Sequence, residues 1–161
     1  MIVSDTTPIS NFLHLGRIAV LGELFGTLHI PPAVKQEIDE GFTRDRDWLN
    51  CLELRTVVVS RPRSRLLVQR FKRNLHAGEA EAICLALERK ARLCLLDDRD
   101  ARTQAELNGV PLVGTLGILI EAKHAGLLGS VRQAMDFLRD HRRFWVDDAT
   151  YRRVLVLADE R

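Results

Sequence analysis

Apolar and polar positions along this chain follow two alternating periods. Short strand-like runs are separated by longer segments in which apolar residues recur every three or four positions. The predicted strands are residues 1–5, 27–31, 52–59, 93–96 and 110–113. This alternation is typical of a doubly wound α/β domain, in which helices cover both faces of a mostly parallel sheet.

Helical periodicity occupies most of the remaining chain. The predicted helices cover residues 6–15, 18–25, 32–41, 64–73, 79–90, 101–108 and 115–125, and two more apolar patterns of helical spacing lie at 131–138 and 151–158. Thr115 and Ser130 are predicted to cap the helices that follow them. Residues 42–50 are polar and charged and carry neither pattern.

Composition and charge limit the number of domains and the classes of protein to which the chain can belong. The chain has 161 residues and is 46% hydrophobic, which favours one domain, 1–161, with a single well-buried core. The 24 basic and 22 acidic residues give a net charge of only +2, so net charge alone does not predict nucleic-acid binding. No apolar stretch approaches the ~20 residues that span a bilayer, and no secretory signal pattern precedes the first strand. We therefore expect a cytoplasmic protein.

Several classes of site lack support. Cys51, Cys84 and Cys94 show no paired spacing, which argues against a disulfide framework and a structural zinc site. The five histidines form no zinc-ligand spacing either. Neither the glycine-rich dinucleotide motif nor the P-loop motif occurs.

Acidic residues recur where predicted strands end or the following helices begin. Asp5 ends the first strand, Glu37 follows the second, Glu79 opens the helix 79–90, and Asp97 and Asp98 end the strand 93–96. Parallel strands point their carboxyl ends to the same edge of a sheet, so these residues can converge in one crevice. Several carboxylates at such a place suit Mg²⁺ or Mn²⁺, and hence metal-assisted phosphoryl chemistry.

Helix geometry separates Glu79 from its neighbour Glu81. At about 100° per residue, Glu79 shares a face with the apolar Ala82 and Ile83, whereas Glu81 points about 200° away, toward Glu88. Glu79 is therefore predicted to be a ligand and Glu81 a supporting or solvated residue. The alternative is that Glu79 is merely an acid favoured at the start of a helix.

Structural explanations compete for the other acids. Asp5 could cap the helix that follows it, and Glu37 could belong to an ordinary helix surface. Of Asp97 and Asp98, one is expected to face the crevice while the other caps the next helix or faces solvent. The pattern does not decide between these two.

Five stretches resemble PIN-domain proteins, in particular a prokaryotic PIN-like branch related to VapC-type toxin ribonucleases. They are Ile2-Val3-Ser4-Asp5-Thr6-Thr7-Pro8, Pro31-Pro32-Ala33-Val34-Lys35-Gln36-Glu37-Ile38, Gly78-Glu79-Ala80-Glu81-Ala82-Ile83, Leu95-Leu96-Asp97-Asp98-Arg99-Asp100-Ala101-Arg102 and Gly114-Thr115-Leu116-Gly117. Many members have Asp at the third acidic position, where this chain has Glu79.

The resemblance implies a PIN-like three-layer α/β/α fold with a central, mostly parallel sheet of four to five strands. It also implies a Mg²⁺- or Mn²⁺-dependent ribonuclease, often a homodimer and often held by a small antitoxin protein. Carried over by position, the metal acids are Asp5, Glu37, Glu79 and one of Asp97 or Asp98. Thr6 and Thr115 become their polar neighbours.

A basic segment precedes the Glu79 helix. It contains no acid and carries Arg61, Arg63, Arg65, Arg70, Lys72 and Arg73. We expect these side chains to contact RNA phosphates. Phe71 could stack a base, although a lone aromatic residue in a helix more often belongs to the core. The alternative is a solvated helix face. Arg142, Arg143, Arg152 and Arg153 form a second basic group.

Two other function classes remain open. One is a receiver-like or phosphatase-like protein with an Asp phosphoryl acceptor, although Asp5 is followed by Thr6-Thr7 rather than by a second Asp two residues on. The other is a PIN-fold protein that only binds a partner. The helices from about residue 130, with Phe144, Trp145 and Val146, carry surplus apolar surface and are predicted to contribute to a dimer.

Overall fold

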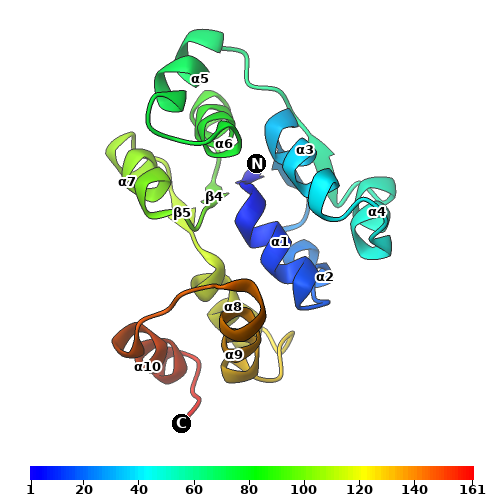
Figure 1. Ribbon diagram of the computed structural model, residues 1–161, viewed down its shortest axis with the longest axis vertical. Coiled ribbons are helices and arrows are strands. Elements are labelled where there is room, and N and C mark those ends of the chain that lie inside the picture. The colour runs from blue at the N-terminus through cyan, green and yellow to red at the C-terminus, as the bar shows by residue number, and fades with distance from the viewer.

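Five parallel strands form the centre of the computed structural model, which describes residues 1–161 (Figure 1). The strands are β1 (Ile2–Ser4), β2 (Leu28–Ile30), β3 (Val57–Val59), β4 (Leu93–Leu95) and β5 (Leu112–Val113). Their order is β3-β2-β1-β4-β5, and every neighbouring pair is parallel. The predicted α/β class with a four- to five-stranded sheet is confirmed.

Helices connect the strands and extend the domain beyond the last one. They are α1 (Thr6–His14), α2 (Ala19–Phe25), α3 (Pro32–Gly41), α4 (Arg46–Glu53), α5 (Arg65–Lys72), α6 (Ala77–Glu88), α7 (Arg99–Leu107), α8 (Thr115–His124), α9 (Val131–Arg142) and α10 (Asp148–Leu157). Figure 1 shows α8, α9 and α10 gathered at one end of the molecule. None of the helices is both long and apolar enough to cross a membrane.

The sheet separates two apolar layers. Successive residues of a strand point to opposite faces, so Ile2 belongs to the apolar layer formed with α1 to α4 and α8 to α10, whereas Val3 belongs to the layer formed with α5, α6 and α7. The three layers of an α/β/α domain result.

The strand order reverses at β1, and this reversal places the site. From β1 the chain passes to β2 on one side, and later returns to β4 on the other. Connections that leave adjacent strands in opposite directions open a crevice at their carboxyl ends. The backbone N–H of Asp5 donates to the carbonyl of Leu95 at 3.0 Å, so the ends of β1 and β4 meet there.

One predicted strand was too long. Residues 52–59 were expected to be a strand and 42–50 irregular, but α4 occupies 46–53 and only Val57–Val59 is strand. The helix buries just two side chains, Trp48 and Cys51, and its remaining residues are partly or fully exposed. Its N-cap Asp45 accepts from the Trp48 backbone N–H at 2.9 Å. Two apolar anchors in eight residues are too few for helical periodicity to be visible.

The predicted cap of α8 was also wrong. Gly114 occupies the N-cap position, and Thr115 is the first residue of the helix. The Thr115 hydroxyl is engaged elsewhere, since it donates to Asp97. Ser130 does cap α9, as predicted, by accepting from the Gln133 backbone N–H.

Candidate functional site

Asp5 lies directly after β1, at the carboxyl edge of the sheet. Its residue is 3% exposed, and although it occupies the N-cap position of α1 its carboxylate makes no capping hydrogen bond. The capping explanation is therefore wrong. Burial raises the pKa of Asp5, a backbone hydrogen bond from Thr6 opposes this, and the charges of Glu79, Glu37 and Asp97 raise it further, to about 7.

The two aspartates after β4 have separate tasks. Asp98 is exposed and caps α7 by accepting from the Ala101 backbone N–H at 2.9 Å. Asp97 turns inward, where its carboxylate accepts from the backbone N–H of Thr115 at 2.7 Å and from its hydroxyl at 2.6 Å. Burial raises the pKa of Asp97, against the opposing effect of these hydrogen bonds. Asp97 is thus held by Thr115, whereas Asp98 caps α7 and is exposed but still near enough to raise the pKa of Glu79.

Three residues around Asp97 were missed by sequence reasoning. Buried Asn11 of α1 donates its amide to the Thr115 hydroxyl at 3.1 Å. Arg102 donates to the Leu96 carbonyl at 2.9 Å, and its charge lowers the pKa of Asp97. A Cβ on Gly114 would lie 2.8 Å from Asp97 Oδ1, so glycine admits the carboxylate. Arg102 is therefore an internal cation beside one of the acids.

Glu79 opens α6 on its buried side, as the helical spacing predicted. The residue is 9% exposed, and its Oε2 accepts from the His76 backbone N–H at 3.1 Å. The alternative of a helix-start acid is thus partly realised, with one oxygen satisfying the start of the helix. Burial raises the pKa of Glu79, the His76 hydrogen bond lowers it, and the charges of Asp98 and Glu37 raise it.

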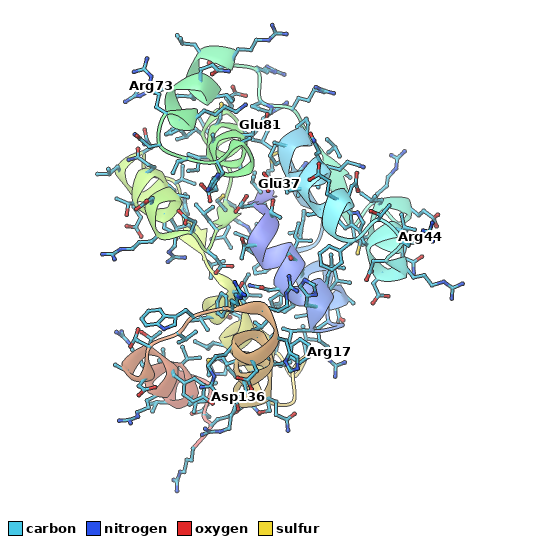
Figure 2. The ribbon with its side chains drawn as sticks, viewed as in Figure 1. Arg17, Glu37, Arg44, Arg73, Glu81 and Asp136 are labelled. Carbon is cyan, nitrogen blue, oxygen red and sulfur yellow. The ribbon has the colours of Figure 1, made fainter.

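Glu37 reaches the same region from α3. Its residue is exposed, but its carboxylate accepts a hydrogen bond from the Thr6 hydroxyl, directly after Asp5 in the chain. A Cβ on Gly78 would lie 2.8 Å from Glu37 Oε1. Glu37 therefore lies against the start of α6, beside Glu79, rather than on an ordinary helix surface. Figure 2 shows Glu37 on α3 and Glu81 on the neighbouring α6.

The donors suit a hard divalent cation, although they do not form a closed ligand shell. No three Asp, Glu, His or Cys side chains are arranged so that they could already hold a metal ion. The fit rests on charge, because the carboxylates of Asp5, Glu37, Glu79 and Asp97 are near enough for the other three to raise the pKa of Asp5. A cation among oxygen donors would relieve that repulsion.

The predicted RNA-binding residues divide into two sets. Arg61, Arg63, Arg65 and Lys72 line a cleft of about 510 Å³ that also includes Glu81. Arg70 and Arg73 are exposed outside this lining, and Figure 2 shows Arg73 projecting from the side of α5 remote from α3.

Phe71 is 5% exposed and packs in the core on the α5–α7 face of the sheet. A side chain buried in this way cannot stack a base, so of the two alternatives for Phe71 the structure supports the core residue.

The C-terminal helices expose part of the predicted apolar surface. Trp145 is 82% exposed, and Val156 and Leu157 on α10 are 72% and 50% exposed. Phe144 is half-buried and packs against the core that includes α9 and α10. The surplus surface therefore comes from Trp145 and α10 rather than from Phe144.

Comparison with known proteins bears on the family and the fold. A family model described as "PIN domain" (DUF3368) matches residues 1–160. A solved structure of a PilT N-terminus domain protein from the hyperthermophilic archaeon Sulfolobus solfataricus is similar to 81% of this chain and 96% of that one, with 22% identity and a TM-score of 0.50. At this identity, the likeness concerns the fold. Among curated proteins, no sequence matches the chain.

Proposed function

Because the chain belongs to the PIN-domain family, we propose that it is a Mg²⁺- or Mn²⁺-dependent ribonuclease whose metal acids are Asp5, Glu37, Glu79 and Asp97. PIN domains are generally nucleases and usually use divalent ions, which supports the broad class. The observation that carries the specific proposal is the burial of Asp5 among the other three carboxylates, with a pKa raised to about 7.

Hydrogen bonds and protonation set the state of three of these carboxylates before an ion binds. Thr115 fixes both oxygens of Asp97, and Thr6 fixes Glu37, so these carboxylates are oriented before an ion binds. Because its pKa is raised to about 7, the Asp5 carboxylate is partly protonated near neutral pH, and an ion bound there would displace the proton. When bound, the ion supplies Lewis-acid chemistry that lowers the pKa of water and compensates phosphodiester charge.

The basic cleft gives the RNA a path beside the acids. Arg61, Arg63, Arg65 and Lys72 line it, and Glu81 lies one turn along α6 from Gly78, which contacts Glu37. Contacts of this kind position a phosphate backbone without reading its bases. We propose that single-stranded RNA lies in the cleft and passes toward the carboxyl edge of the sheet.

Cleavage of an unstructured RNA oligonucleotide tests the proposal. We expect cleavage with Mn²⁺ or Mg²⁺, none with EDTA, and none for Asp5→Asn or Asp97→Asn. Asp100→Asn is the matched control, because it alters an exposed acid in the first turn of α7, and it should retain cleavage. No cleavage by the wild type would favour a protein that only binds, and phosphoryl transfer to Asp5 would favour the receiver-like class.

Thermal unfolding tests the metal separately from cleavage. Millimolar Mn²⁺ should raise the Tm of the wild type, since an ion that binds only the folded state stabilises it by mass action. Asp5→Asn should lose most of this increase. Equal increases in the two proteins would place the ion elsewhere.

We further propose that the protein is the toxin of a toxin–antitoxin pair and a homodimer. The exposed Trp145, Val156 and Leu157 supply apolar surface for a second copy or a small antitoxin. Light scattering should report a dimer that Trp145→Ser and Val156→Ser weaken. A wild-type monomer at high concentration would contradict the dimer, and an adjacent small reading frame whose product blocks cleavage is the expected sign of an antitoxin.

A further inference from the structure

Helix α3, which carries Glu37, has no cap of its own. Its N-cap residue is Pro31, which makes no side-chain cap hydrogen bond, and its first turn contains no acid. The free backbone N–H of Ala33 is instead satisfied from α6, because it donates to Glu81 Oε2 at 3.0 Å. A carboxylate at this place also meets the positive end of the α3 dipole.

A second contact joins the same two helices one turn further along. The Glu37 carboxylate lies against Gly78, where a Cβ would come within 2.8 Å of Oε1 and 2.9 Å of Oε2. Ala33 and Glu37 are four residues apart on α3, and Gly78 and Glu81 are three apart on α6. The two contacts therefore fix the sliding of one helix along the other as well as their separation.

We infer that Glu81 is a positioning residue that holds α3 in the register at which Glu37 faces Glu79 and Asp5. The inference rests on the proposed function, since it assigns Glu81 a role toward the same acids. Glu81 itself is not a ligand in this assignment: its Oε2 is used by Ala33, and its side chain lines the basic cleft.

A second glutamate on the same face of α6 provides an internal control. Glu88 lies seven residues after Glu81 and accepts from the backbone N–H groups of Arg63, at 2.7 Å, and Ser64, at 2.6 Å, where α5 begins. Helix α5 carries none of the four acids. Loss of the Glu88 carboxylate should therefore disturb a helix start without moving the site.

Four variants test the role of Glu81, with Mn²⁺ affinity measured by electron paramagnetic resonance of the free ion. Glu81→Ala should lower Mn²⁺ affinity about tenfold or more, as loss of a group that orients ligands does. Glu81→Gln keeps an acceptor oxygen and should restore affinity to within about threefold of the wild type. Glu88→Ala should lower the Tm by about 2–4 °C, like a lost helix cap, with unchanged Mn²⁺ affinity. Asp5→Asn reports independently whether Mn²⁺ occupies the proposed site.

Hydrogen exchange in the metal-free protein tests whether Glu81 holds α3, independently of the proposed function. Glu81→Ala should accelerate exchange in the first two turns of α3, and Glu81→Gln should not. The inference is overturned if Glu81→Ala changes neither hydrogen exchange nor Mn²⁺ affinity. It is also overturned if Glu81→Gln changes both as much as Glu81→Ala does, or if Glu88→Ala loses as much Mn²⁺ affinity. Mn²⁺ binding that Asp5→Asn does not alter would instead contradict the proposed function, and the exchange result would still decide whether Glu81 holds α3.

Discussion

Two carboxylates with little exposure, Asp5 after β1 and Glu160 after α10, have pKa values that are shifted in opposite directions. Burial raises the pKa of Asp5 to about 7, the backbone N–H of Thr6 opposes this rise, and the charges of three other carboxylates add to it. Burial acts in the same direction on Glu160, beyond α10, but hydrogen bonds from Arg132 and Val131, with Lys123 and Ser130, lower its pKa to about 2.

The contrast shows how a carboxylate's surroundings distinguish a structural role from a chemical one. Glu160 joins α8 and α9 to the end of the chain, and its charge is fully used by protein donors. The carboxylates at the sheet edge instead face one another, and their remaining charge is available to a cation. Burial alone does not separate the two roles; the donors around each group do.

Cleavage should show the largest difference between the two regions. Glu79→Gln should reduce RNA cleavage by on the order of a thousandfold, about 4 kcal/mol in the activation barrier, because it removes a charged donor of the ion. Glu160→Gln should leave cleavage within about twofold at temperatures where it is folded. Single-turnover assays at saturating Mn²⁺ measure both. Comparable losses in the two variants would erase the distinction.

The pH dependence of stability should differ in sign. The folded pKa of Asp5, about 7, lies above its ordinary 3.8, so protonation favours folding and this contribution is lost as pH rises from about 4 to 7. The full difference corresponds to at most on the order of 4 kcal/mol. Glu160 acts oppositely, since its contribution is present above pH 4.5 and is lost as pH falls toward 2.

Urea unfolding of metal-free protein checks this sign. The stability of Asp5→Asn relative to the wild type should increase between pH 4 and 7, and that of Glu160→Gln should not. A flat difference for Asp5→Asn across this range would mean that its carboxylate is solvated in the folded protein.

The C-terminal end should respond more strongly in stability than in function. Glu160→Gln should cost about 2 kcal/mol at pH 7, since it weakens charge-assisted hydrogen bonds to the start of α9. Glu121→Gln alters an exposed glutamate on α8 and should cost less than about 0.5 kcal/mol. Chemical unfolding compares the pair, and equal costs would deny Glu160 its structural role.

The smallest effect concerns salt. Replacing Arg61, Arg65 and Lys72 with Ala should lower the dependence of RNA affinity on salt by about 0.7 for each RNA phosphate that the variant no longer neutralises. Arg152→Ala with Arg153→Ala, on α10, is the matched change at the other end and should leave the slope unaltered. Fluorescence anisotropy with a labelled RNA measures both slopes. An unchanged slope in the first variant would mean that these side chains do not contact RNA and form only a solvated helix face.

Local patterns were sufficient for the strands other than β3, for most helices and for the placement of Asp5 and Glu79. Both acids sit where a period ends or begins, so their side of the element is fixed by neighbours in the chain. Asp97 and Asp98 were not separable, because a change of one residue at a strand end reverses which side chain faces inward. The structure resolves them through Thr115, distant in the chain.

Contacts between distant segments account for what the sequence could not predict. Asn11 and Thr115 are 104 positions apart, and Glu81 and Ala33 are 48 apart, so no local spacing signals either hydrogen bond. Arg102 was visible only as one more basic residue in a helix. Helix α4 was not predicted from the sequence, because Trp48 and Cys51 are its only buried residues.

Because β1 is central in the sheet, the site can form only after much later parts of the chain have been synthesised. Asp5 emerges first, but its strand needs β4 at its side, and Asp97 needs Thr115 to orient it. At about 5–20 residues per second, synthesis of the intervening chain takes roughly 6–22 seconds. A nascent chain therefore carries its first acid well before the crevice exists, and translation itself delays any chemistry at this edge of the sheet until the fold has closed.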